Sequence, residues 1–86
     1  MNFIVDWEDD ARDDLAIAWM AASTLERNAI TVAQDHIDRL LATNPQGNGW
    51  PLSEGLFATE FPPLRVLYEI FDDVHKVKVV AMNLVS

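Results

Sequence analysis

Hydrophobic residues follow two different spacings along this chain, and each spacing predicts a different type of element. Residues 3–7 place an apolar side chain at every second position, which is typical of a β-strand. Apolar residues then recur at helical spacing in two segments that meet near Ser23, so two amphipathic helices are expected. Their apolar stripes consist of Ala11, Leu15, Ala18, Trp19 and Ala22 in the first helix, and of Ala29, Ile30, Ala33, Ile37, Leu40 and Leu41 in the second.

Local signals mark the boundaries of the second helix. Ser23 and Glu26 have the spacing of a capping box, in which a hydroxyl and a carboxylate satisfy the first backbone N–H groups of a helix. The helix is expected to end before Asn44-Pro45, because proline disfavours helical geometry in the residue that precedes it. Residues 44–55 contain three glycines and two prolines and are predicted to be a loop.

Three further strands are predicted at residues 56–61, 64–71 and 77–85. The connections between them are short enough for antiparallel hairpins. The sequence therefore predicts a single α+β domain over residues 1–86, made of an N-terminal strand, a helical hairpin and a three-stranded antiparallel meander. We expect the four strands to form one mostly antiparallel sheet, with the helical hairpin over one face.

The last two strands are apolar on both faces, although two helices can cover only one face of a sheet. The face that carries Tyr68 is expected to be buried. The opposite face combines apolar and charged residues: Arg65, Leu67, Glu69 and Phe71 from one strand, and Lys78, Val80, Met82 and Leu84 from the next. An uncovered apolar patch usually marks a binding site, so these residues are predicted to bind a partner.

Two residues have alternative interpretations. Trp50 lies in the glycine-rich loop, and either plugs the core beneath it or projects toward a partner; the plug is favoured, since a long loop usually needs an anchor. Because it could project outward, Trp50 is also one of the predicted partner-binding residues. Arg65 either contacts a phosphate or a partner's carboxylate, or forms a cross-strand pair with Glu60 or in the neighbourhood of Glu69, which contributes little if exposed. Trp7 and Trp19 both fit core positions.

The charge balance limits the classes of partner. Six Lys and Arg residues stand against fourteen Asp and Glu residues, which gives a formal net charge of −8. Phosphate contacts from Lys and Arg supply most non-specific affinity for nucleic acids, so an extensive nucleic-acid surface is not expected. A basic protein partner suits this charge better.

Residue types exclude several kinds of site. The absence of cysteine excludes disulfides, thiolate zinc sites and a cysteine nucleophile. The acidic residues at 6–14 lack a loop that wraps an ion, so neither a metal nor a cofactor is predicted. The apolar runs are far shorter than the roughly 20 residues that a membrane span needs. No basic region precedes an apolar stretch at the N-terminus, and a cytoplasmic protein is therefore expected.

The ordered combination of these segments resembles the RelE/ParE superfamily of toxins from type II toxin–antitoxin systems. The resemblance rests on the strand and Ala-rich helix at residues 3–22 and on the helix end IDRLLATNP at 37–45. It continues in the glycine-rich loop and in the strand LRVLYEI at 64–70, which is followed by an acidic turn and a valine-rich strand. The resemblance implies a single RelE/ParE-like domain and a small antitoxin whose C-terminal segment lies over the sheet or the helices.

The two branches of this superfamily imply different activities. Members of the RelE branch cleave mRNA in the ribosomal A site, using basic residues on the sheet face and a C-terminal tyrosine or histidine. Members of the ParE branch inhibit DNA gyrase and lack that catalytic set. By position, the arginine of the third strand matches Arg65, the one candidate catalytic residue. The lysines of the preceding strand have no counterpart, since Glu60 stands there, and the last strand offers Met82, Asn83 and Leu84 in place of basic or aromatic groups.

The leading hypothesis is therefore a toxin that acts by binding a protein, as ParE does, more than by catalysis. The second hypothesis is a non-toxic interaction module or a decayed toxin on the same fold. The third is a ribosome-dependent mRNA endonuclease with an atypical site. The expected partners are a small antitoxin and either DNA gyrase or the ribosome, and the apolar sheet face would also allow a homodimer.

Overall fold

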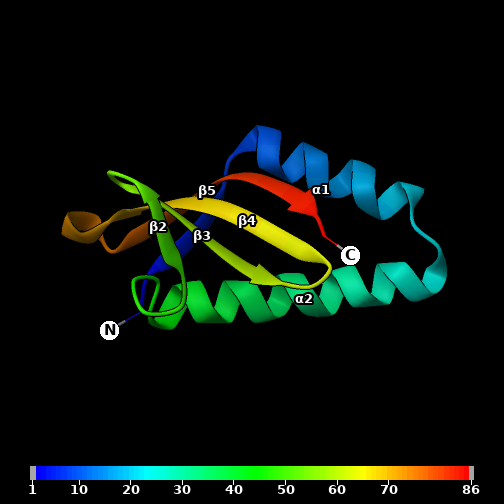
Figure 1. Cartoon of the computed structure of the whole chain (residues 1–86), viewed down its shortest axis with the longest axis horizontal. Coiled ribbons are helices and arrows are strands. Elements are labelled where there is room, and N and C mark those ends of the chain that lie inside the picture. Colours follow the sequence, from blue (N-terminus) through cyan, green and yellow to red (C-terminus); the bar gives the residue numbers. More distant parts are fainter. Residues whose placement is uncertain (1, 86) are drawn as a thin grey trace.

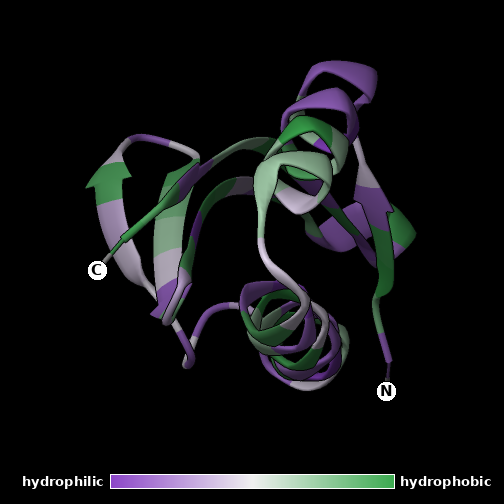
Figure 2. Ribbon diagram, turned by 90° about the vertical axis from the view of Figure 1, so that its right-hand side faces the viewer, coloured by the Kyte–Doolittle hydropathy of each residue, from purple (hydrophilic) through white to green (hydrophobic). Residues whose placement is uncertain are grey.

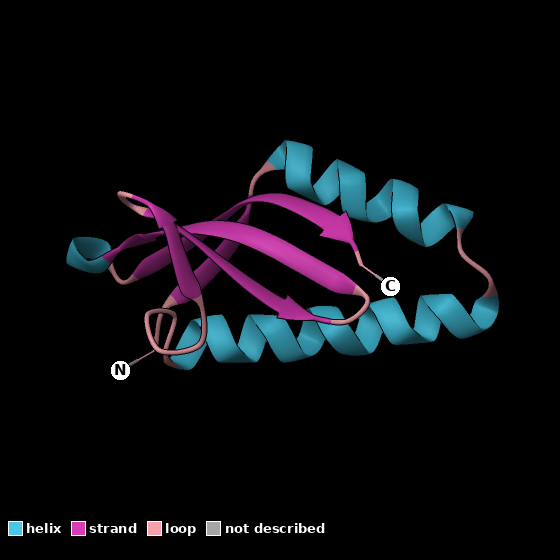
Figure 3. Ribbon diagram, viewed as in Figure 1, coloured by secondary structure: helices cyan, strands magenta, loops and turns pink. Residues whose placement is uncertain are grey.

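A computed structural model describes residues 2–85 of the chain. Two helices and five strands follow one another along the sequence (Figures 1 and 3). They are β1 (Ile4–Trp7), α1 (Asp9–Ala21), α2 (Thr24–Thr43), β2 (Trp50–Ser53), β3 (Leu56–Phe61), β4 (Leu64–Phe71), a short 3₁₀ turn (Asp72–Val74) and β5 (Lys76–Leu84). The predicted α+β fold is confirmed.

The strands form one sheet in the order β1-β5-β4-β3-β2. The pairs β2–β3, β3–β4 and β4–β5 are antiparallel, whereas β1 lies parallel to β5. The prediction of four strands was wrong, because β2 forms within the segment that was predicted to be a loop. Its second residue, Pro51, lacks a backbone N–H, and an edge strand is where a sheet tolerates such a residue.

The predicted boundaries of the second helix, α2, are confirmed. The backbone N–H of Glu26 donates to Ser23 Oγ at 3.2 Å, and the backbone N–H of Ser23 donates to Glu26 Oε1 at 2.9 Å, so the capping box at the start of α2 is complete. The helix α2 ends at Thr43, directly before Asn44-Pro45. Both termini thus follow from local sequence signals alone.

The core lies between both helices and one face of the sheet. Ile30, Ile37 and Leu41 of α2 are buried against Val66 and Val79 of the sheet. Figure 2 views α2 nearly end-on and shows the twisted sheet curving beside it, with hydrophobic residues in both strands and helices. Among the helices of residues 2–85, none is both long and apolar enough to cross a membrane.

Two of the three tryptophans, Trp19 and Trp50, lie outside the core, contrary to prediction. Trp7 is buried as predicted, but Trp19 is 42 % exposed, so its predicted core position was wrong. Arg27 explains the outward position: its guanidinium lies 4.4 Å from the centre of the Trp19 ring, and its Nε donates to the backbone O of Trp19 at 2.8 Å. This arginine thereby holds the C-terminal end of α1, where carbonyl groups lack helical partners.

The loop after α2 is anchored by a buried proline and a tyrosine. The hydroxyl of Tyr68 donates to the backbone O of Pro45 at 2.6 Å, and both residues are fully buried. Gly49 passes so close to the Tyr68 hydroxyl that a Cβ atom would collide with it. The anchor that the sequence assigned to Trp50 is therefore supplied by Pro45 and Tyr68.

Candidate functional site

The face of the sheet opposite the helices, here called the open face, carries most of the predicted site residues. Arg65, Leu67, Glu69 and Phe71 alternate along β4 with residues that point into the core. The sheet register places Lys78 of β5 directly opposite Glu69. These five residues share one face, as the alternation in the sequence predicted, and their role in partner binding stays a prediction.

The prediction that Met82 and Leu84 lie on the open face was wrong. A β-bulge in β5 shifts the register: Leu67 pairs with Ala81, whereas the next residue, Tyr68, pairs with Val79. Val80 is the extra residue of this bulge. Because one extra residue exchanges the two faces of a strand, Met82 is 9 % exposed within the core, and Leu84 lies opposite Leu64 on the helix side.

Trp50 lies on the open face, and the favoured interpretation as a core plug was wrong. It is 41 % exposed and pairs with Ala58 of β3. The guanidinium carbon of Arg65 lies 5.7 Å from the centre of the Trp50 ring. This distance fits a cation–π contact, so the tryptophan covers one side of the arginine.

The two lysines of the open face are balanced by acidic residues near the start of the chain. Lys76 Nζ lies 3.4 Å from Asp6 Oδ2, and Lys78 Nζ lies 3.7 Å from Glu8 Oε1. All four side chains are partly exposed, so each pair contributes little to stability. The parallel pairing of β1 with β5 creates these contacts, and sequence inspection missed them because it did not predict which strand lies beside β1.

Arg65 differs from the other basic residues. Within residues 2–85, it is the one basic side chain that has neither an ion pair nor a hydrogen bond. The register places Glu60 directly across from it on β3, but no ion pair within 4.0 Å forms. Glu60 and Arg65 are therefore neighbours across the two strands, as predicted, but they do not form an ion pair. The guanidinium remains able to bind a carboxylate or a phosphate.

Groups suited to proton transfer lie away from Arg65. Tyr68 faces the core, as predicted, and its burial raises the pKa of its hydroxyl to about 12. His75 is exposed in the turn before β5, where its ring lies 5.5 Å from that of Phe3. His36 lies on α2, with its ring 4.1 Å from that of Phe61. Among residues 2–85, no three His, Asp or Glu side chains are grouped as metal ligands would be.

Comparison with known proteins found similar solved structures. No family model and no curated protein matches this chain. A chain of the toxin–antitoxin complex RelBE2 from Mycobacterium tuberculosis has a TM-score of 0.81 at 20 % identity, and the match covers 99 % of this chain and 93 % of that one. The isolated E. coli RelE toxin has a TM-score of 0.60 at 13 % identity, covering 98 % of this chain and 85 % of that one.

A third solved structure agrees with these two. A chain of the intact E. coli RelBE toxin–antitoxin complex has a TM-score of 0.59 at 13 % identity, and the match covers 98 % of both chains. Sequence identities this low establish a common fold and leave the activity to be argued from the site. The predicted resemblance is confirmed at that level: over nearly its whole length, the chain has the fold of the RelE toxins.

Proposed function

We propose that this protein is the toxin of a type II toxin–antitoxin system, and that it acts by binding a protein. The toxin role is supported by the fold, which extends over nearly the whole chain. The choice of binding over cleavage depends on one observation: among residues 2–85, the open face presents a single unpaired cation, Arg65, with apolar and acidic neighbours.

RNA cleavage demands more than this face offers. Attack by a 2′-hydroxyl needs a base near that hydroxyl, an acid at the leaving oxygen and cations on the phosphorane. Arg65 could stabilise charge, but Lys76 and Lys78 are already paired with carboxylates. Glu60 lies directly across from Arg65 on β3, and Glu69 lies four residues further along β4 on the same face, so both would repel the successive phosphates of an RNA chain. The face therefore favours a protein ligand that presents a hydrogen-bond acceptor to Arg65 and apolar side chains to Leu67.

The proposed partners follow from this role. Two of the similar structures are named as toxin–antitoxin complexes, which supports a small antitoxin as the first partner. DNA gyrase is the proposed target and the ribosome is the alternative, and both place the action in the cytoplasm. A homodimer through the open face is the competing assembly. Elution at the volume of a monomer, unchanged by concentration in size-exclusion chromatography, would argue against it.

Induced expression in a bacterial host tests the proposal. We expect growth arrest with DNA damage and intact mRNA, and we expect Arg65→Ala to relieve it. The matched control is Arg39→Ala, because Arg39 is an exposed arginine of α2 whose ion pair is with Asp35 of the same helix. Arrest with mRNA cut in the presence of ribosomes would instead support the nuclease. Normal growth would support the non-toxic interaction module.

A further inference from the structure

The helix α1 changes character along its length. Its first half contains four aspartates, whereas residues 15–22, which form the second half and the C-cap, are all apolar. Figure 2 shows this change from hydrophilic to hydrophobic along the helix. A helical segment that is apolar on every side is normally enclosed on every side. In this structure the sheet encloses it on one side only, because α1 lies at the margin of the molecule (Figure 1).

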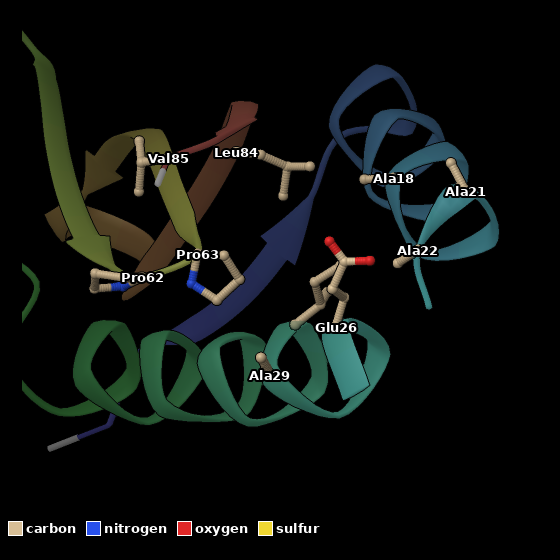
Figure 4. A pocket seen from close by; sticks show the side chains of 10 residues that line it. Ala18, Ala21, Ala22, Glu26, Ala29, Pro62, Pro63, Leu84 and Val85 are labelled. Carbon is tan, nitrogen blue, oxygen red and sulfur yellow. The ribbon is translucent and has the colours of Figure 1, made fainter. Parts of the chain in front are cut away.

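The two sides of this apolar segment have different surroundings. On the inner side, Leu15 is buried in the core, and Ala18 and Ala22 border the groove that α1 forms with α2 and the end of β5 (Figure 4). On the outer side, Ile17 and Met20 are 65 % and 71 % exposed. Large apolar side chains this exposed, and adjacent on one helix face, favour contact with another molecule.

A hollow adjoins the outer side of α1. It measures about 450 Å³ and lies between the two helices, where Ala16 and Met20 of α1 and Thr31 of α2 form part of its lining. The small side chain of Ala16 leaves space for a larger one, as in the packing of a ridge of one helix into a groove of another. The surface thus offers both a projecting side chain, Ile17, and a hollow beside it.

The charges on this surface make it complementary to itself. Asp13 lies on the same outward stripe as Ala16, Ile17 and Met20, at helical spacing, and this exposed carboxylate forms no ion pair within residues 2–85. Arg27 lies at the opposite end of the stripe, where its Nη2 donates to the backbone O of Met20 at 3.1 Å. Within the same residues it has no ion pair either.

We propose that this surface binds a second copy of the chain, through antiparallel packing of the two α1 helices about a two-fold axis between Ala16 and Ile17. A two-fold interface requires a patch that complements itself, and this patch has that property. In this register, Ile17 of each copy enters the hollow at Ala16 of the other. Asp13 then lies beside Met20 of the other copy, where Arg27 is bound, so that two equivalent ion pairs form.

This assembly is independent of the proposed function and compatible with it. The net charge of −8 opposes association of two copies, and the pairs between Asp13 and Arg27 offset this repulsion locally. The open face lies on the other side of the sheet from α1, so a dimer joined in this way presents two open faces, each with its Arg65. It therefore differs from a homodimer that is formed through the open face itself.

Sedimentation velocity of the purified chain tests the proposal, and we expect a dimer at micromolar concentrations. Met20→Asp places a charge within the apolar stripe, and we expect self-association at least about tenfold weaker. Val32→Asp is the matched control, because Val32 is an apolar residue of α2 that is 61 % exposed and does not line the hollow. It should associate as the unchanged chain does. Circular dichroism spectra check that both variants retain their helices.

The absence of cysteine from the chain permits a second measurement that needs no disruptive variant. Ala16→Cys places one thiol in each copy beside the proposed two-fold axis, so mild oxidation should link the two copies. A disulfide requires Cα atoms within about 7 Å of each other. Val32→Cys and Leu67→Cys lie away from this axis and should therefore remain unlinked under the same conditions.

Three results would overturn the inference. They are a chain that sediments as a monomer at every concentration, a dimer that Met20→Asp leaves intact, and efficient linking through Leu67→Cys in place of Ala16→Cys, which would assign the dimer to the open face. These measurements use the purified chain alone, so failure of the toxin role in the growth assay does not affect them. A monomeric chain that arrests growth would overturn this inference and leave the proposed function in place.

Discussion

The indole Nε1 of Trp7 donates a hydrogen bond of 2.9 Å to Oδ1 of Asp38, and this bond joins β1 to the C-terminal half of α2. Trp7 is buried and Asp38 is half-buried. The two residues are 31 positions apart, so the contact forms only when the first strand has docked onto the helix. It is a polar link between two side chains, and each partner depends on the other for its hydrogen bond.

We expect Trp7→Phe to destabilise the protein by about 2–4 kcal/mol, because a buried ring becomes smaller and the carboxylate of Asp38 loses its donor. Unfolding in urea, followed by circular dichroism, measures the change. Trp19→Phe is the matched control, since Trp19 is largely outside the core, and it should cost less than Trp7→Phe. Equal losses for the two variants would contradict the importance of the link.

The stability contributed by Asp38 should depend on pH. Burial raises the pKa of Asp38, the hydrogen bond from Trp7 opposes that shift, and the charge of Asp35 adds to it. The folded state therefore holds the Asp38 proton at a pH where the unfolded chain has released it. The stabilisation is fully present below the unfolded pKa, near 3.9, and is lost as pH rises through the folded pKa.

Asp38→Asn removes this titration while keeping an oxygen for the Trp7 indole. The difference in unfolding free energy between the unchanged chain and Asp38→Asn should shift in favour of Asn as pH rises from about 4 to 7. Comparing the two proteins at each pH cancels the titration of the other carboxylates. A difference that stays constant over this range would refute the raised pKa.

A separate pH effect is expected at high pH from Tyr68, the one tyrosine of the chain. Burial raises its pKa to about 12, above the value of about 10 in an unfolded chain. The stability linked to its protonation is present below pH 10 and is lost as pH rises toward 12. Ultraviolet absorbance of tyrosinate should therefore appear only near that pH in the folded protein, and near pH 10 in urea. Tyr68→Phe should cost about 1–2 kcal/mol by removing the bond to Pro45.

Local patterns predicted much of this fold. The capping box at Ser23, the stop before Pro45 and the bounds of β3 and β4 depend on neighbouring residues, and the structure has each where the sequence placed it. Trp19 misled the prediction, because the helical stripe admits it and only the position of Arg27 shows that it faces outward. The acidic partners of Lys76 and Lys78 could not be predicted either, because these ion pairs depend on a parallel pairing between β1 and β5, which are distant in sequence.

The candidate site was predicted only as far as simple alternation holds. Alternation placed Arg65 and Glu69 correctly on one face, since β4 is regular. It failed in β5, where Val80 is inserted and every residue beyond it changes face. A run of apolar residues carries no local signal for such an insertion, because both faces read as hydrophobic. The contact between Trp50 and Arg65 also could not be predicted, because it requires the edge strand β2, which includes Pro51, to pair with β3.

Deleting Val80 tests whether this extra residue sets the register of β5. Without the extra residue, the pairing would either turn Met82 out of the core and Asn83 inward, or force the strand to re-form the bulge elsewhere. We expect a loss of about 2–5 kcal/mol, comparable to removing a buried Met side chain. Val80→Ala, which keeps the count of residues, should cost less. Unfolding in urea distinguishes the two variants, and equal losses would show that the side chain, not the register, matters.

Substitution of Arg65 can serve as a probe of function. Its contact with Trp50 is partly exposed, and such a cation–π contact is worth about 0.5–1 kcal/mol. Because the guanidinium has no ion pair or hydrogen bond within residues 2–85, Arg65→Ala should leave the free energy of unfolding within about 1 kcal/mol of the original. Any large loss of growth arrest in this variant would then report a lost contact with the target. Trp50→Ala separates the two roles: it uncovers the arginine without removing its charge. If both variants unfold far more easily than the unchanged chain, Arg65 is structural, and the open face must be probed instead at Leu67.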